Sequence, residues 1–175
     1  MSKARMNVVV RTEQPSDIAA IRIVNLDAFP SEAEANLVDD LRANGKATLS
    51  LVAVQNERVI GHILFSPVML ESNVDQGPIL GLAPMAVLLG FQREGVGSLL
   101  VTTGLDHCKR SGVSSVIVLG HSDYYPRFGF QAASQFGVSC EYDVPDENFM
   151  LVELAKGASN HISGIARYQP EFASL

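Results

Sequence analysis

A glycine-containing segment in the middle of the chain carries the residue types that bind phosphate. The segment runs from Gln92 to Ser98 and follows an apolar run from Ile79 to Leu89. After it, Leu100, Gly104 and Cys108 recur at helical spacing on one side of a predicted amphipathic helix. Backbone amides and a helix N-terminus then converge on one point, which predicts a site for a phosphate group.

Two common phosphate-binding motifs do not fit this segment. A dinucleotide fingerprint requires a third glycine after Gly95 and Gly97, and Leu100 stands at that position. A nucleoside triphosphate loop requires a lysine followed by serine or threonine, and here Gly97 is followed by Ser98 and Leu99. The segment therefore reads as Gln-x-x-Gly-x-Gly between a strand and a helix.

That pattern resembles the pyrophosphate-binding signature of the GNAT superfamily of acyl-CoA-dependent N-acyltransferases. The resemblance extends by order of elements from about Val8 to Phe130, and more loosely to the end of the chain. It implies acetyl-CoA as cosubstrate, bound through Gln92, Arg93, Glu94, Gly95, Val96, Gly97 and Ser98.

The same resemblance implies a slot that holds the pantetheine arm of acetyl-CoA. Pro84 lies inside the run from Ile79 to Leu89 and cannot donate a ladder hydrogen bond, so this strand must contain a bulge or lie at an edge. In GNAT proteins two central strands part at such an irregularity. The matching backbone positions in this chain are Met85, Ala86 and Val87.

A second block, from Val116 to Phe130, contains the candidate catalytic residues. In the resembling family a tyrosine four residues before the glycine of a Gly-Phe turn often acts as general acid, and Tyr125 stands four residues before Gly129. Tyr124 is expected to face elsewhere. The general base stays open between His121 at a strand end, Glu32 in the expected acceptor wall, and water relayed to backbone carbonyls.

The rest of the chain predicts one α/β domain over residues 1–175, with a core at about 8–130 and C-terminal strands at about 131–175. A strand is expected at Asn7 to Arg11, followed by helices up to about Phe29 and from about Ser31 to Asn44. Three strand-like runs then predict an antiparallel meander, at Leu49 to Gln55, Val59 to Leu70 and Ile79 to Leu89, with a turn at Asn73 to Gly77.

Behind the second block, Val138 to Tyr142 and Phe149 to Leu154 read as a final hairpin, and Ile162 to Tyr168 as a short last strand. The expected fold is GNAT-like: a mixed, mostly antiparallel twisted sheet flanked by helices, with a splayed central strand pair.

Length, charge and cysteine content exclude several classes of protein. A length of 175 residues with 47% hydrophobic content suits one packed domain. The net charge of −6 argues against general nucleic-acid binding. No long apolar run or signal peptide is visible, and two isolated cysteines, Cys108 and Cys140, indicate buried thiols rather than a metal site, so we expect a cytoplasmic protein with no membrane partner.

These features predict an N-acetyltransferase that moves an acetyl group from acetyl-CoA to a primary amine by direct attack of the bound amine. Two alternatives stay open at this point: a transferase for a longer acyl-CoA, and a non-catalytic acyl-CoA-binding or partner-binding module. The amine acceptor, whether a small molecule, a peptide N-terminus or a protein lysine, is not determined by the sequence, nor is the oligomeric state, a homodimer included.

Overall fold

The computed structural model describes residues 7–71 and 77–175. In these ranges one large sheet has the strand order β1-β2-β3-β5-β6-β9-β7, and a small sheet has the order β4-β10-β8. The strands are β1 (Val9–Thr12), β2 (Leu49–Gln55), β3 (Arg58–Pro67), β4 (Met69–Leu70), β5 (Ile79–Val87), β6 (Ser115–Leu119), β7 (Gln131–Ala132), β8 (Val138–Cys140), β9 (Phe149–Glu153) and β10 (Gly164–Arg167).

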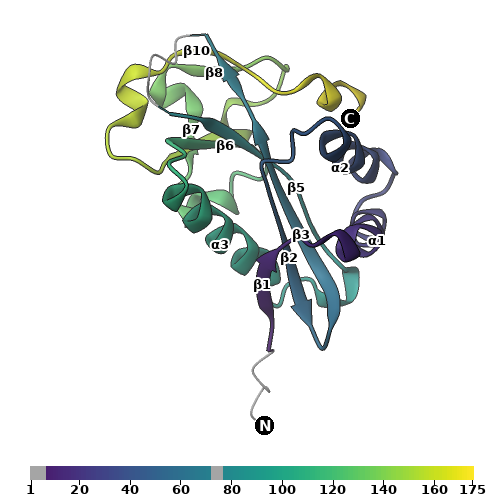
Figure 1. The fold of residues 1–175 in the computed structure, drawn as a ribbon. Helices are drawn as coiled ribbons and strands as arrows, with labels where there is room; N and C mark the ends of the chain where they lie inside the picture. Colours follow the sequence, from purple (N-terminus) through teal and green to yellow (C-terminus); the bar gives the residue numbers. More distant parts are fainter. Residues whose placement is uncertain (1–6, 72–76) are drawn as a thin grey trace.

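Three α-helices cover the large sheet. They are α1 (Ile18–Ala28), α2 (Ala33–Ala43) and α3 (Val96–Arg110). Figure 1 shows α1 and α2 on one face of the sheet and α3 on the other. The described residues also form short 3-10 helices. These are η1 (Pro15–Asp17), η2 (Leu89–Phe91), η3 (Tyr125–Phe128), η4 (Ala133–Phe136), η5 (Asp146–Asn148), η6 (Ala158–His161) and η7 (Pro170–Ser174).

The helices form where apolar residues repeat at helical spacing. The buried side of α3 consists of Val96, Leu100, Val101, Gly104 and Cys108, which confirms the predicted amphipathic face. Helix α2 likewise buries Leu37, Val38 and Leu41, the residues expected to share one side. Both helices therefore owe their position to an apolar stripe that packs on the sheet.

The predicted antiparallel meander is present as β2, β3 and β5, which pair in sequence order. The run from Val59 to Leu70 is divided, because β3 ends at Pro67 and β4 joins the small sheet. The turn expected at Asn73 to Gly77 lies mostly outside the described residues. In the large sheet all neighbouring strands are antiparallel except β5 and β6, so the mixed and mostly antiparallel prediction is confirmed.

The predicted C-terminal hairpin is wrong. Strand β9 pairs with β6 and β7 in the large sheet, whereas β8 runs parallel to β10 in the small one. The reason is that β9 completes the sheet beside β6, so its buried residues (Phe149, Met150, Leu151 and Val152) pack into the main core. The short last strand expected in the segment from Ile162 to Tyr168 is confirmed as β10.

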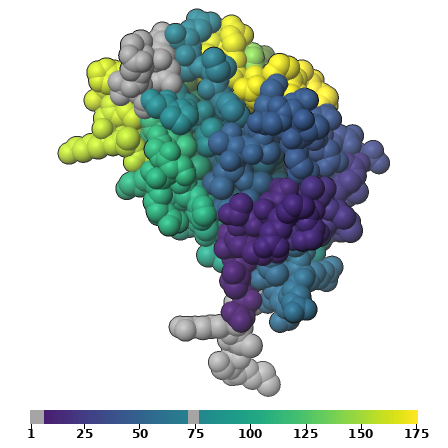
Figure 2. Space-filling view, viewed as in Figure 1, coloured from purple at the N-terminus to yellow at the C-terminus, as the bar shows by residue number. Residues whose placement is uncertain are grey.

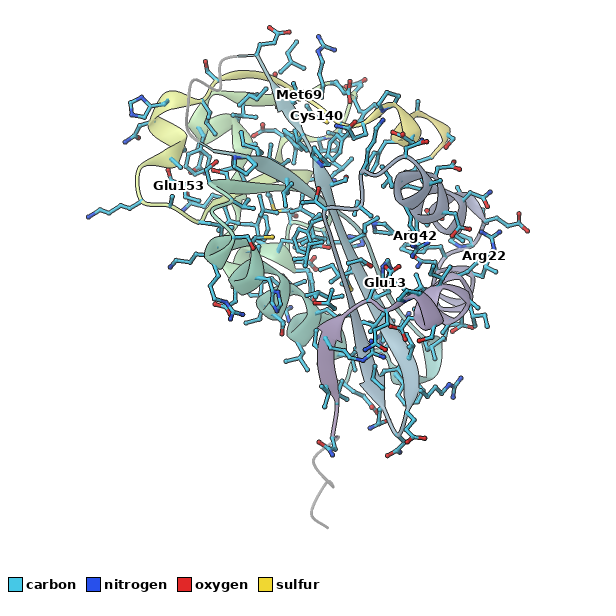
Figure 3. All side chains as sticks on the ribbon, in the orientation of Figure 1. Glu13, Arg22, Arg42, Met69, Cys140 and Glu153 are labelled. Carbon is cyan, nitrogen blue, oxygen red and sulfur yellow. The ribbon has the colours of Figure 1, made fainter. Side chains whose placement is uncertain are left out.

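A buried polar network joins the N-terminal segment to the sheet. The His62 side chain on β3 has no solvent exposure, with its Nε2 atom 2.9 Å from Ser50 Oγ and its Nδ1 atom 3.3 Å from Asn25 Nδ2. The Ser50 hydroxyl also donates to Glu13, which forms a 2.7 Å ion pair with Arg42 of α2. Figure 3 shows Glu13 and Arg42 together beside the sheet. His62 is thus a core residue with polar partners.

Candidate active site

The two central strands of the large sheet part after three residue pairs. Strand β5 pairs with β6 only where Ile79, Leu80 and Gly81 face Ser115, Val116 and Ile117. Beyond Gly81, β5 continues to Val87 paired with β3 alone, and β6 continues to Leu119 paired with β9 alone. Among the described residues, the edge of β5 that faces β6 therefore has no strand partner from Leu82 onward.

Pro84 stands at the start of this opening, as its sequence position predicts. The Ala83–Pro84 peptide bond is cis, and the register between β3 and β5 shifts nearby, between Ile63 and Phe65. A proline removes a ladder donor at this point. Met85, Ala86 and Val87 follow it and all line the opening.

The opening widens into a cleft of about 940 Å³. Its walls come from the end of α1, the start of α2, the free half of β5, the turn before α3, and the segment after β6. The lining residues are Ala28, Phe29, Glu34, Leu37, Leu82, Ala83, Pro84, Met85, Ala86, Val87, Gln92, Arg93, Gly95, Gly97, Ser98, Leu119, Gly120, His121, Tyr124, Tyr125, Arg127 and Leu175.

One end of the cleft is the N-terminus of α3. The first hydrogen bond of this helix runs from the Leu99 N–H to the Gly95 carbonyl, so the N–H groups from Val96 to Ser98 have no partner within the helix. Gly95, the residue before the helix, has a φ of 90°. This is a left-handed backbone conformation that residues with a Cβ atom rarely adopt. The geometry is suited to an anion.

The seven loop residues do not all face the cleft in the same way. Gln92, Arg93, Gly95, Gly97 and Ser98 line it, whereas Glu94 is exposed outside the lining and Val96 has its side chain in the core. The Gln92 side chain donates a 3.0 Å hydrogen bond to the Val87 carbonyl, which ties the loop to the end of β5.

Tyr125 lies in the cleft but is mostly buried. Its ring packs edge-on against Tyr124 at 5.1 Å and Phe130 at 5.6 Å between centroids. Gly120 makes room for this ring, because a Cβ atom at Gly120 would overlap the Cε2 atom of Tyr125. Burial raises the pKa of the Tyr125 hydroxyl to about 12, so this group keeps its proton at neutral pH.

Tyr124 does not face elsewhere, and that expectation is wrong. Its hydroxyl lies 3.4 Å from Ser98 Oγ, and a Cβ atom at Gly97 would lie 3.1 Å from it. The segment from Gly120 to Tyr124 is not helical, so consecutive side chains do not follow helical spacing there. Both tyrosines therefore reach the cleft.

The two candidate bases differ in position. His121 lines the cleft directly after β6, and its side chain is exposed to solvent. Glu32 precedes α2, is exposed, and does not belong to the lining. Glu34, two residues further on, lines the cleft instead, because the first turn of α2 directs this side chain inward.

Arg127 and Glu34 line the cleft but were not among the site residues predicted from the sequence. The Arg127 guanidinium lies 4.6 Å from the centre of the Tyr124 ring, close enough for a cation–π contact. Arg127 lies two residues before Gly129 in the block from Val116 to Phe130, and this position was the available signal. Glu34 had no such signal, since its position also suits an ordinary first-turn acid.

The described residues contain no helix long and apolar enough to span a membrane. They also contain no group of three or more His, Cys, Asp or Glu side chains arranged to hold a metal ion. Cys108 is buried, as expected, but Cys140 is only half-buried because it lies on β8 of the small sheet.

A sheet that opens beside a helix N-terminus is the arrangement expected from the resemblance to the GNAT class of acetyltransferases, and comparison of the sequence agrees. The profile of the Acetyltransferase (GNAT) family matches residues 18–130, so the chain belongs to that family.

Individual relatives resemble the chain over nearly its whole length. YhbS of Escherichia coli K12, named an uncharacterized N-acetyltransferase, is 36% identical over 166 residues, which cover 94% of this chain and 98% of YhbS. The crystal structure of E. coli YhbS in complex with CoA matches with a TM-score of 0.91 and 34% identity, over 99% of this chain and 96% of that one. A GNAT acetyltransferase of Brucella melitensis in complex with acetyl-CoA matches with a TM-score of 0.78 and 32% identity, over 96% and 99% of the two chains.

Proposed function

We propose that residues 1–175 act as one N-acetyltransferase domain, which transfers the acetyl group of acetyl-CoA to a primary amine by direct attack of the amine on the thioester. The observation that carries this proposal is the convergence, in one cleft, of an unpaired strand edge, a helix N-terminus and a buried tyrosine. The CoA and acetyl-CoA complexes of the two similar bacterial structures support the same ligand here.

The cleft fits acetyl-CoA at two separate places. The N–H groups from Val96 to Ser98 can bind the pyrophosphate without any basic side chain, and Arg93 and Arg127 add positive charge nearby. The unpaired backbone of Met85, Ala86 and Val87 can hydrogen-bond the amide groups of the pantetheine arm as an additional strand would. Acetyl-CoA then supplies the thioester that the amine attacks.

The residues of the cleft have separate tasks in this reaction. The amine nitrogen forms a bond to the acetyl carbon and loses a proton, while the carbon–sulfur bond breaks and the thiolate gains one. Tyr125, which keeps its proton at neutral pH, donates to the departing sulfur. His121, exposed in the cleft at the end of β6, accepts the proton from the amine. The products are an N-acetyl amine and free CoA.

Release of the CoA thiol tests this function directly. The protein is incubated with acetyl-CoA and a panel of primary amines, and free thiol is measured together with the mass of the acetylated product. We expect thiol release that depends on the amine. Tight binding of acetyl-CoA without any transfer across the panel would instead identify a non-catalytic acyl-CoA-binding module.

A further inference from the structure

A second cavity of about 260 Å³ opens beside the cleft. It lies between the parted strands and the C-terminal segment, and its walls are mostly apolar and aromatic. The lining residues are Ala83, Leu119, Tyr142, Tyr168, Phe172 and Leu175. Ala83, Leu119 and Leu175 also line the cleft, so the two cavities adjoin where β5 and β6 separate.

The aromatic walls of this cavity are held by contacts outside it. The Tyr168 ring lies 5.0 Å from Phe172 and 6.2 Å from Tyr142, with the second pair stacked. Phe172 belongs to η7, which packs against α2 (Figure 2, yellow against blue). A 2.7 Å ion pair between Lys46 and Glu171 fastens that contact. An apolar cavity of about 150 Å³ is large enough for benzene, so this one has room for a substituted ring.

The Tyr168 hydroxyl is the unusual group of the cavity. Tyr168 is 9% exposed, and its hydroxyl is shielded from solvent with no hydrogen-bond partner among the described residues. Its ring lies close on β5, since a Cβ atom at Gly81 would be 2.8 Å from the Tyr168 Cε1 atom. Burial raises the pKa of Tyr168, and the neighbouring Cys140 and Tyr142 add to this effect. A buried hydroxyl without a partner carries a desolvation cost, which a polar ligand group would offset.

Glu34 provides a carboxyl group in the cleft that adjoins this cavity. It lines the cleft from the first turn of α2, and its Oε2 atom is buried with no hydrogen-bond partner among the described residues. A carboxylate with an unused oxygen suits the ammonium group of an incoming amine.

We propose that the acceptor is an arylalkylamine. Glu34 binds the amino group, the ring occupies the cavity beside Tyr142 and Phe172, and a polar ring substituent pairs with the Tyr168 hydroxyl. This inference rests on the proposed acetyltransferase function and specifies its substrate class. A longer acyl chain of an acyl-CoA is the other chemistry that could enter the cavity, but an alkyl chain would leave Glu34 and the Tyr168 hydroxyl without partners.

Amine binding to the protein saturated with CoA tests the inference by calorimetric titration. The probes are tyramine, phenethylamine and 1,4-diaminobutane. We expect tyramine to bind about tenfold or more tightly than 1,4-diaminobutane, because only the aromatic amines bury apolar surface in the cavity. We expect Tyr168→Phe to remove the preference for tyramine over phenethylamine while binding of phenethylamine stays within about twofold.

Two further variants locate the binding site. Phe172→Leu should weaken both aromatic amines about fivefold and leave 1,4-diaminobutane unchanged, whereas Glu34→Gln should weaken all three. Phe136→Leu, which removes a half-buried ring outside both cavities, is the matched control and should change none of them. Because Tyr168→Phe keeps the ring, it gives a result even if Phe172→Leu fails to fold.

Three outcomes overturn the proposal. Equal affinity for all three amines would exclude an aromatic subsite. A wild-type preference for tyramine over phenethylamine in Tyr168→Phe would exclude the pairing of the ring substituent with the Tyr168 hydroxyl. Tighter binding of hexanoyl-CoA than of acetyl-CoA, lost in Phe172→Leu, would assign the cavity to the acyl chain. Aromatic amines that bind as expected but release no CoA thiol would overturn the transferase function and not the amine site, so the two proposals fail separately.

Discussion

At the scale of single residues, Tyr125 is the group to which we assign the general-acid role. Its ring is packed by Phe130 and Tyr124, and Tyr125 lines the same cleft as the start of α3. Tyr125→Phe keeps this packing and removes only the oxygen. We expect kcat to fall by about 100-fold while the Kd for acetyl-CoA changes less than about threefold.

Steady-state kinetics with a working amine and calorimetric titration of acetyl-CoA measure these two effects separately. A variant with the wild-type kcat would show that Tyr125 serves packing alone, and that water protonates the departing thiolate.

His62 makes stability depend on pH. Burial is the main cause that lowers its pKa from 6.5 to about 4, and the neighbouring Arg42 also lowers it, although Glu13 acts in the opposite direction. Between pH 6.5 and 4 the unfolded chain therefore binds a proton that the folded protein does not. The stabilisation from neutral His62 is complete above about pH 6.5 and is lost as the pH falls toward 4, by about 1.4 kcal/mol per pH unit.

Urea unfolding at several pH values in this window measures the slope. His62→Asn should make the fall in unfolding free energy shallower, whereas His161→Asn, at an exposed histidine, should leave it unchanged. If the slopes of wild type and His62→Asn coincide, other groups control the acid sensitivity.

At the scale of elements, the start of α3 depends on two glycines for different reasons. Gly95 needs its left-handed backbone, whereas Gly97 needs space, because a Cβ atom there would lie 3.1 Å from the Tyr124 hydroxyl and 3.2 Å from the Met85 Cε atom. A larger side chain at Gly97 would occupy the space between the helix start and β5. We expect Gly97→Val to weaken acetyl-CoA binding at least tenfold, which is about 1.4 kcal/mol.

Gly90→Val is the matched control for this loop. Gly90 lies in η2, outside the cleft, with open space around its Cα, so the same substitution should leave acetyl-CoA affinity unchanged. Circular dichroism confirms that both variants fold. Unchanged affinity in a folded Gly97→Val protein would contradict the assignment of the phosphate site.

Elements with a local signal could be predicted from the sequence, and those defined by distant contacts could not. The residues from Leu49 to Gln55 form a strand-like apolar run that ends at a turn, so β2 was predicted with its observed bounds. Strand β9 has a similar local pattern, but it pairs with β6, which lies about 30 residues earlier. Because no short turn connects these two strands, the local sequence does not indicate their pairing. The predicted hairpin with β8 was wrong for this reason.

The same distinction between local signals and distant contacts applies to the residues of the site. Pro84 and the glycines of the turn have fixed backbone requirements, so the open strand and the helix start could be predicted. The inward direction of Glu34 and the aromatic cavity around Tyr168 depend on how α2 and the C-terminal segment pack, which the periodicity of either segment does not contain.

At the scale of the whole molecule, the large sheet consists of two parts joined along a short border. Three residue pairs link β5 to β6, and a ligand in the slot would touch both parts. We expect acetyl-CoA to raise the melting temperature, with stabilisation of about 2.7 kcal/mol at a concentration 100 times its Kd. Differential scanning fluorimetry measures this effect, and Gly97→Val should require about tenfold more acetyl-CoA for the same shift. A melting temperature independent of acetyl-CoA would argue against binding between the two parts.

The order of the strands also has a consequence for synthesis on the ribosome. Strands β1, β2, β3 and β5 all lie within the first 87 residues, whereas β6, which forms the other wall of the slot, comes only after α3. While residues 88–119 are still being made, the whole edge of β5 has no partner, and an unpaired edge can add a strand from another chain. In the finished protein β6 covers only the first part of that edge, and the remainder is the edge to which we assign the ligand. The feature that creates the slot therefore also makes the nascent chain vulnerable to aggregation during this interval.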